Sequence, residues 1–201
     1  MKIDFPLPTD GKRHEYCSSC HSENFSRVFE GEKTFYRCHD CGDKSPRRIV
    51  IDPQIVWWID DQTKEYWHES VGIFIFNEEG KALFFLRVLY PFASTIPAGH
   101  LDVGETVDAA VKREVREETG LELSAVKLFS EEDIVGDRCG RGADVHKWHL
   151  YTAHVKGNTP VRINDEGGKP VWLSLDEALK KDLVYVVRYF IEKYGQKLMQ
   201  A

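Results

Sequence analysis

The sequence predicts an α/β domain preceded by a small cysteine-rich module. Strand and helix patterns alternate after residue 46, which is typical of an α/β domain, and four of the five cysteines lie in two close pairs before that point. The chain has 201 residues, of which 42% are hydrophobic, so it can bury one substantial core and a small appendage but not two full-size domains. We expect the module over residues 1–46 and the larger domain over residues 47–201.

The overall charge and the number of cysteines exclude several classes of protein. Lys and Arg number 27 against 33 Asp and Glu, and the net charge of −6 argues against a protein that wraps polyanions with a basic surface. Five cysteines in this arrangement are too few for a secreted disulfide scaffold. Residues 1–30 contain no apolar run of the signal-peptide type, and no segment approaches the ~18 apolar residues of a membrane span. We expect a cytoplasmic protein with no membrane partner.

The module contains two Cys-x2-Cys pairs whose spacing is typical of a zinc site. A gap of 17 residues separates the pairs, and each pair can hold one side of a tetrahedral ion from a tight turn. Four thiolates complete the coordination of zinc, so we expect a structural Zn²⁺ that supplies much of the folding free energy of the module. Residues 1–12 lack periodicity and are expected to be a loosely held lead-in. The expected zinc ligands are Cys17, Cys20, Cys38 and Cys41.

A zinc ribbon can also bind nucleic acid, and the module contains basic residues that would contact phosphates. Acidic residues are interleaved with these basic residues, so nucleic acid is the weaker of the two interpretations. Cys139 lies far from the two pairs and is expected to be a free thiol. The basic residues are Arg37, Lys44, Arg47 and Arg48.

The larger domain begins with strands and a hairpin. Two apolar runs flank Gly80, which suits a turn with positive φ, and because both runs are almost continuously apolar we expect the sheet to be covered on both faces. A capping box over residues 174–177 opens a short helix, and an amphipathic helix over residues 183–198 ends the domain. The expected strands are residues 49–51, 54–59, 71–76, 82–89, 126–129, 147–155 and 171–173, with a glycine-rich connection at 136–142.

A helix is expected over residues 106–119, with Thr106 as its N-cap and Gly120 just beyond its end. Its inward stripe begins with apolar residues and ends with carboxylates. Stacked like charges cost a few tenths of a kcal/mol per pair, and the helix dipole disfavours anions at this end. A solvated acidic face is the ordinary explanation of such a run, but these acids continue the stripe that should pack on the sheet, where Mg²⁺ or Mn²⁺ would neutralise them. The acids are Glu114, Glu117 and Glu118.

Residues 99–121 resemble the Nudix box, G-x5-E-x7-R-E-U-x-E-E-x-G-U, where U is aliphatic, and every fixed position matches. The preceding hairpin, the residues 96–99 and the strand and helix over residues 171–179 are also similar to that family, so the resemblance covers about residues 50–200. It implies the Nudix α/β/α sandwich with a mixed sheet. It also implies a hydrolase that uses Mg²⁺ or Mn²⁺ to direct water onto a phosphorus atom of a nucleoside diphosphate linked to another moiety.

The resemblance implies roles for residues in and near the box. Arg113 would orient one of the glutamates through a charge-assisted hydrogen bond, and Glu105 is either an outer ligand or a structural acid. Glu117 or Glu118 ranks first as general base, ahead of residues 131–133 and Glu166. The metal would be held by Gly99, Glu114, Glu117 and Glu118.

The substrate is less well defined by the sequence than the chemistry. In the 136–142 loop, Arg138 and Arg141 could close over a phosphate or a ribose, although such a loop is also an ordinary connector. Four tryptophans could stack on a base, and each is at least as compatible with the core. The partner implied is a nucleotide-type small molecule, and the family resemblance favours a homodimer. The tryptophans are Trp57, Trp58, Trp67 and Trp148.

A zinc ribbon directly ahead of a Nudix domain resembles the NADH pyrophosphatase branch of the family. The S-Q-P-W-x-F-P-x-S signature of that branch is absent from residues 121–201, so specificity for NAD(H) is not expected. The alternative to an enzyme is a ligand sensor or nucleic-acid-binding protein that keeps the fold without catalysis, but an intact set of three costly glutamates favours the enzyme. An isomerase is weaker still, because Cys139 has no supporting pattern.

Overall fold

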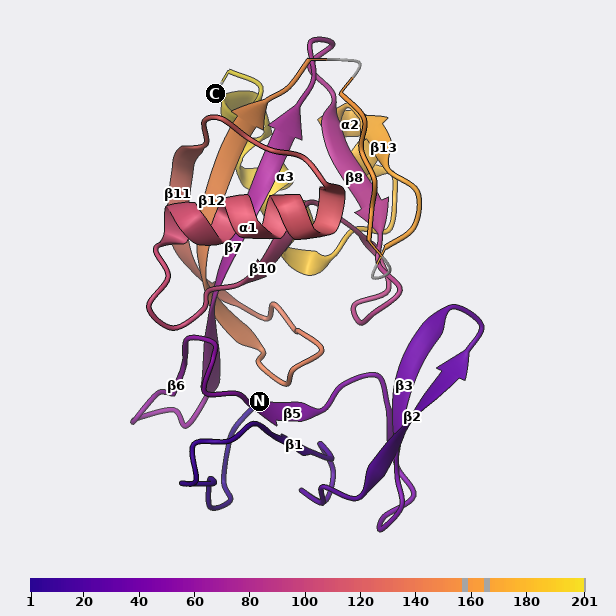
Figure 1. The fold of residues 1–201 in the computed structure, drawn as a ribbon, viewed down its shortest axis with the longest axis vertical. Coiled ribbons are helices and arrows are strands. Elements are labelled where there is room, and N and C mark those ends of the chain that lie inside the picture. Colours follow the sequence, from indigo (N-terminus) through magenta and orange to yellow (C-terminus); the bar gives the residue numbers. More distant parts are fainter. Residues whose placement is uncertain (157–158, 165–166, 201) are drawn as a thin grey trace.

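The computed structural model describes residues 1–156, 159–164 and 167–200 (Figure 1). A large sheet with helices on both faces forms most of the molecule, and two small sheets lie at its N-terminal end. Among these described residues, no helix is both long and apolar enough to cross a membrane. The helices are α1 (Val107–Thr119), α2 (Leu175–Leu179) and α3 (Tyr185–Leu198). The strands are β1 (His14–Tyr16), β2 (Phe25–Glu30), β3 (Lys33–Cys38), β4 (Lys44–Ser45), β5 (Ile49–Ile51), β6 (Trp57–Ile59), β7 (Tyr66–Phe76), β8 (Ala82–Leu86), β9 (Ser94–Thr95), β10 (Ala98–His100), β11 (Lys127–Val135), β12 (Val145–His154) and β13 (Val171–Leu173).

The large sheet is mixed, as expected. Its main order is β11-β12-β7-β8-β13, while β6 and β10 pair with β7 and β9 pairs with β8. β12 runs parallel to β7 and places His146 opposite His68, whereas the other neighbours are antiparallel. β10 places His100 opposite Ser70, so residues of three adjacent strands converge near the beginning of β7. This convergence puts polar side chains at the beginning of β7, whose second half is apolar and buried.

Each face of the sheet has its own hydrophobic core, which confirms that the sheet is covered on both sides. On one face, α1 buries its apolar stripe against alternate residues of β7, including Val71 and Ile73. On the other face, Phe74 and Phe76 pack against α3. Figure 1 shows α1 crossing one face of the sheet and α3 on the opposite face. The position of α1 is therefore set by core packing.

The ends of α1 lie where the sequence predicts them. The Thr106 side chain accepts a hydrogen bond from the Ala109 backbone N–H at 3.3 Å, and Gly120 adopts φ +68 with its N–H bonded to Arg116. The predicted capping box is also present, because Ser174 and Glu177 exchange backbone and side-chain hydrogen bonds. These local signals depend on neighbouring residues alone.

Several strand boundaries differ from the sequence predictions. β7 begins at Tyr66 instead of residue 71, and β11 continues to Val135 instead of ending at 129, because their polar halves are held by pairing with neighbouring strands. Conversely, two strands are shorter than predicted. The strand expected over residues 54–59 begins only at Trp57, and the strand expected over residues 82–89 ends at Leu86. The last helix begins two residues later than predicted. Hydrophobic periodicity does not report pairing of this kind.

The expected loose lead-in is packed against the larger domain. The Tyr66 backbone N–H donates to the Met1 carbonyl at 2.9 Å, and Ile3 donates to Lys64 at 3.2 Å. Apolar side chains on this segment form a third core with β5 and β7, which compensates for the ordering of the chain. The apolar residues of the lead-in are Ile3, Phe5 and Leu7.

Candidate active site

Glu114 lies against the backbone of β10. A methyl group at Gly99 would lie 2.0 Å from Oε1 of Glu114, so no larger residue fits there while this side chain keeps its position. The Glu114 side chain is 14% exposed. Burial raises the pKa of Glu114, and the adjacent Arg113 guanidinium acts in the opposite direction. The glycine therefore makes the space that this glutamate fills.

Arg113 links Glu105, which precedes α1, to Glu114 on α1. Its Nη1 donates to Oε1 of Glu114 at 2.6 Å, and its Nη2 donates to Oε2 of Glu105 at 2.9 Å. Nε of Arg113 also donates to Glu105, and Nη2 reaches the backbone oxygen of His100 at 3.1 Å. These hydrogen bonds with Glu105 raise the pKa of Arg113. Glu105 thus fixes an arginine that in turn orients Glu114.

The other two glutamates differ in exposure. Glu118 is buried, with 5% of its surface exposed, and its Oε2 accepts a hydrogen bond from the Ala98 backbone N–H at 2.9 Å. The Glu117 side chain is 53% exposed, and its Oε2 lies 3.4 Å from Nη1 of Arg113. Glu117 is therefore the least constrained of the three carboxylates, and Glu118 fastens α1 to β10.

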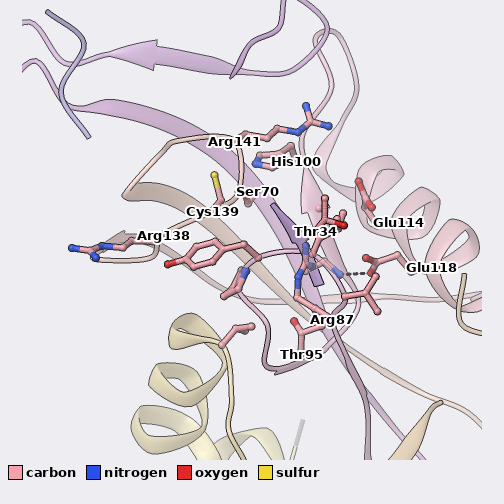
Figure 2. A pocket seen from close by; sticks show the side chains of 18 of the residues that line it. Thr34, Ser70, Arg87, Thr95, His100, Glu114, Glu118, Arg138, Cys139 and Arg141 are labelled. Atoms are coloured by element: carbon pink, nitrogen blue, oxygen red, sulfur yellow. Dashed lines mark hydrogen bonds between the residues drawn. The ribbon is translucent and has the colours of Figure 1, made fainter. Parts of the chain in front are cut away.

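These side chains form one wall of a cleft of about 870 Å³. Figure 2 shows Glu114 and Glu118 on α1 pointing into it, with Arg138 and Arg141 on other sides. The cleft is within the size range of small-molecule sites. Strand β3 of the N-terminal module also lines it, through Thr34. Apart from Arg113 on α1, the arginines of the cleft are Arg13, Arg27, Arg48, Arg87, Arg138 and Arg141. The cleft thus sets carboxylates opposite cations.

The structure brings some of the other expected residues to the cleft. Arg141 lies there with its Nη1 3.3 Å from Asp52, and Arg138 is largely exposed. Trp148 lines the cleft, and its Nε1 donates to Asp137 at 2.7 Å. Glu166 lies outside the described residues.

Within the part of the chain that the structure describes, the cleft is not lined by Trp57, Trp58 or Trp67. The rings of Trp58 and Trp67 stack on each other with centroids 5.5 Å apart. Trp57 packs edge-on against Tyr66 and joins the third core. These three tryptophans therefore have packing roles.

The acids of residues 131–133 lie on β11 and, in the described part of the chain, do not line the cleft. Glu132 accepts hydrogen bonds from the hydroxyls of Tyr194 at 2.6 Å and Tyr189 at 2.8 Å, and it pairs with Lys193. It connects β11 to α3. This placement removes Glu132 from the candidates for general base.

Arg87 is a cleft residue that the sequence analysis missed. It follows β8 directly, and its Nε is buried without a hydrogen-bond partner among the described residues. A buried guanidinium nitrogen without a partner is costly, which indicates a position for an anionic ligand. The available signal was a single arginine inside an apolar run of residues 82–89.

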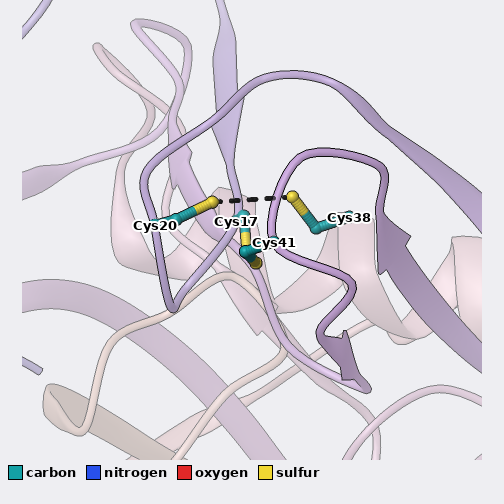
Figure 3. Close-up of side chains that lie close together, drawn as sticks. All are labelled: Cys17, Cys20, Cys38 and Cys41. Atoms are coloured by element: carbon teal, nitrogen blue, oxygen red, sulfur yellow. Dashed lines mark hydrogen bonds between the residues drawn. The ribbon is translucent and has the colours of Figure 1, made fainter.

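The four cysteines of the module converge from two turns, as Figure 3 shows. The Sγ atoms of Cys17 and Cys41 lie 3.7 Å apart, and those of Cys20 and Cys38 lie 3.5 Å apart. Zinc–sulfur bonds of about 2.3 Å in a tetrahedron require sulfur–sulfur distances of about 3.8 Å. The residues present therefore fit a zinc ion.

Three of the four basic residues considered for nucleic-acid binding are engaged within the chain. Arg47 donates to the Cys139 carbonyl at 2.9 Å and to Asp144, Arg48 pairs with Glu15, and Lys44 pairs with Glu30. Arg37 is exposed on β3. These intramolecular contacts account for Arg47, Arg48 and Lys44 without nucleic acid.

Comparison with known proteins identifies the family. The family described as "NUDIX domain" matches residues 66–194. The nucleoside triphosphatase NudI of Escherichia coli K12 is 27% identical over 114 residues, which cover 54% of this chain and 81% of that protein. A MutT Nudix hydrolase from Burkholderia pseudomallei superposes with a TM-score of 0.55 at 26% identity, covering 64% of this chain and 98% of the other. The Nudix domain of Shewanella oneidensis NrtR, solved with ADP ribose, gives a TM-score of 0.57 at 20% identity, covering 69% and 93%. The chain therefore belongs to the Nudix family and has the fold and the hydrolase class that residues 99–121 predict.

Proposed function

We propose that this protein is a magnesium-dependent pyrophosphohydrolase, active also with Mn²⁺, that cleaves a nucleoside diphosphate linked to another moiety. The observation that carries the proposal is the cleft itself, where three glutamates of α1 face a set of arginines. A phosphate group would bridge these two walls, because a metal ion held by the carboxylates and the guanidinium groups can each bind phosphoryl oxygens. The names of the relatives support the substrate class, since one is a nucleoside triphosphatase and another was solved with ADP ribose.

The donor set at the glutamates fits a hard divalent cation. Carboxylate and backbone oxygens are the ligands that Mg²⁺ and Mn²⁺ prefer, and the space that Gly99 leaves open brings Glu114 against the backbone of β10. The ion would be held by Gly99, Glu114, Glu117 and Glu118. When bound, it would neutralise phosphoryl oxygens and lower the pKa of a coordinated water.

Side chains of the protein position the metal ligands and accept the proton of the attacking water. Arg113 and Glu105 hold Glu114 in place, and Glu118 holds β10 through its bond to Ala98. Glu117 is the exposed carboxylate of the set, so we assign it as the group that accepts a proton from the attacking water, with Glu118 as the second candidate. Accurate placement of these groups lowers the barrier because little reorganisation is left for the reaction itself.

The arginines of the cleft bind the substrate in this proposal. Arg87 offers a buried nitrogen that has no hydrogen-bond partner among the described residues, and Arg138 and Arg141 approach from the 136–142 loop. A guanidinium group can donate two parallel hydrogen bonds to one phosphate, which orients the phosphate as well as attracting it. These residues therefore govern substrate binding more than the rate of the chemical step.

The four-cysteine module holds a structural zinc ion in this proposal and completes a wall of the cleft. Arg27 and Thr34 of its hairpin line the cleft beside the Nudix domain. A sheet of this size buries too little apolar surface to hold its shape alone, so the ion fixes the hairpin that presents these side chains. Zinc thus contributes to substrate binding indirectly.

A hydrolysis screen with Mg²⁺ tests the proposal. The panel contains dinucleotides, nucleotide sugars, nucleoside triphosphates and capped RNA, and the full chain is compared with Glu117→Gln and Glu118→Gln. We expect Mg²⁺-dependent cleavage of at least one nucleoside diphosphate derivative, lost in the variants while substrate binding persists. Binding of nucleotides without cleavage at any Mg²⁺ concentration would show a ligand sensor instead.

A further inference from the structure

A second group of metal-binding side chains lies beside the glutamates. Three histidines and one cysteine each offer a ligand atom, and these four atoms all lie within 4.8 Å of one another. They come from β7, β10, the 136–142 loop and β12, which the sheet register brings side by side. Figure 2 shows two of them, His100 and Cys139, at the cleft. The four residues are His68, His100, Cys139 and His146.

The spacing within this His3Cys cluster matches a tetrahedral ion. Sγ of Cys139 lies 3.6 Å from Nδ1 of His68. Zinc–sulfur and zinc–nitrogen bonds of about 2.3 and 2.05 Å require a sulfur–nitrogen distance of about 3.6 Å in a tetrahedron. The ring of His68 stands nearly perpendicular to those of His100 and His146, at 84° and 75°. Rings in this arrangement can approach one point without stacking on each other.

Burial makes the cluster difficult to explain without a ligand. His68 is 0% exposed, and its Nε2 has no hydrogen-bond partner among the described residues. His146 is also buried, and its Nδ1 lies 3.2 Å from Oδ2 of Asp137. Burying imidazole rings around one point costs free energy, and a metal ion bound through one nitrogen of each ring would offset that cost.

The surroundings of His146 are those of a metal ligand. A histidine that binds a metal through one nitrogen usually directs the other toward a carboxylate. Asp137 supplies that carboxylate, and Nε1 of Trp148 donates to its Oδ2 at 2.7 Å and thereby fixes it. The cluster therefore has four candidate metal ligands and a carboxylate that can hold one of them in position.

We propose that His68, His100, Cys139 and His146 form a second metal site that binds a transition metal ion, with Zn²⁺ as the best fit. Imidazole and thiolate donors select zinc over the magnesium that oxygen donors prefer, so this site is chemically distinct from the glutamates. Four protein ligands leave no open position, which gives the ion a structural role. The proposal does not depend on the hydrolytic function.

The site would fix two parts of the cleft at once. His100 follows Gly99 directly, and its backbone oxygen accepts from Nη2 of Arg113 at 3.1 Å. Cys139 belongs to the loop that presents Arg138 and Arg141. An ion bound by His100 and Cys139 would hold β10 beside the glutamates and tie the loop to the sheet.

Metal analysis of the full chain tests this proposal. The protein is dialysed against millimolar MgCl₂, which displaces zinc from the glutamates, and its zinc content is then measured. We expect about two equivalents per chain in the wild type, one at the four cysteines and one at the His3Cys cluster. Cys139→Ser and His146→Asn should each hold about one equivalent. His149→Asn is the matched control because His149 is buried on the same strand but bonds Glu69 instead, at 2.6 Å, and it should keep two.

A wild-type content of about one equivalent would overturn the proposal, as would two equivalents in both variants. Because either variant could fail to fold, Co²⁺ titration of the metal-free wild type gives a second test. The four-thiolate site should produce strong near-ultraviolet sulfur-to-cobalt absorption. The His3Cys site should add a second tetrahedral spectrum with much weaker absorption of that kind. A titration with a single absorbing step contradicts the proposal.

Discussion

The four-cysteine module and helix α1 both hold metal-binding side chains, but they hold them in different ways. In the module, Cys20 and Cys41 are exposed, and the hairpin leaves Phe29 68% exposed, so little packing fixes the ligands. In α1, Ala110, Val111 and Val115 are fully buried, and the glutamates have hydrogen-bonded partners. We infer that a metal ion builds the first site, whereas the hydrophobic core builds the second before any ion binds.

The strongest predicted change is the unfolding of the module when zinc cannot bind. Structural zinc contributes roughly 10 kcal/mol or more to the folding of small zinc modules, far more than this hairpin gains from packing. We predict that Cys38→Ser exposes the backbone amides of β2 and β3 to hydrogen exchange while α1 stays protected. Hydrogen exchange with mass spectrometry measures both regions in one sample. Protected amides in β2 and β3 of the variant would contradict the inference that a metal ion builds the module.

The next strongest predicted change is a loss of catalytic rate while the fold is retained. Glu117→Gln and Glu118→Gln keep the size of the side chain and an acceptor oxygen, so the fold and the bond to Ala98 should persist. We predict a fall in kcat of about 10²–10⁴ in each variant, with nucleotide affinity retained. Steady-state kinetics and calorimetry measure the two quantities. Glu122→Gln, an exposed acid just beyond α1, is the control and should behave as wild type.

Gly99→Ala tests whether space alone positions Glu114. The new methyl group would lie 2.0 Å from Oε1 of Glu114 and would displace that carboxylate, so we predict roughly a 10²-fold loss of kcat/KM with a modest change in Tm. Gly80→Ala is the opposite case, because its surroundings are open but its φ is +70. That variant should lose about 1 kcal/mol of stability and no activity. Equal activity in both variants would remove Gly99 from the site.

A smaller effect is expected for the cations that bind substrate. Arg87→Ala removes a charged donor from the cleft, and hydrogen bonds to charged groups contribute about 1.5–3 kcal/mol, so KM should rise at least tenfold. kcat should change little. Arg116→Ala is the matched control, because Arg116 is exposed on α1. A rise in KM shared by both variants would show a general electrostatic effect instead of a contact.

The smallest effect separates a structural acid from the catalytic acids. Burial raises the pKa of Glu132, but Lys193, Tyr194 and Tyr189 outweigh it and hold that pKa below its usual value. Ionised Glu132 therefore stabilises the fold fully at pH values above about 4.5, the pKa of an unfolded glutamate. This stabilisation is lost as the pH falls through the lower pKa that Glu132 has in the folded protein. Glu132→Gln should therefore lower Tm at pH 7 and converge with wild type in acid, at unchanged turnover. Melting curves across pH measure this difference.

Local signals in the sequence predict the site well where neighbouring residues determine it. Thr106 and Gly120 mark the ends of α1, and the helical periodicity correctly places Glu118 on its buried face, whereas Glu117 is 53% exposed. The spacing of the cysteines likewise predicts their convergence. In these cases short sequence motifs are enough to predict the local structure.

Features that depend on contacts between distant segments could not be predicted in this way. His68 and His146 meet only because β7 and β12 pair in parallel, and Cys139 reaches them through a loop. The packing of the lead-in and the burial of Arg87 Nε, which has no hydrogen-bond partner in the part of the chain that the structure describes, also depend on contacts between distant segments. Periodicity reports which face of an element is buried, but it does not report which segment covers that face.

Hydrolysis in ¹⁸O-labelled water is the most direct test of the central claim that the glutamates of α1 direct water onto phosphorus. With Mg²⁺ and a nucleoside diphosphate derivative, the wild type should release products of which one carries the label in its phosphate. Glu117→Gln should bind the same compound and yield almost no labelled phosphate. Nucleotide bound by the wild type and recovered intact and unlabelled, at any Mg²⁺ concentration, would contradict the claim.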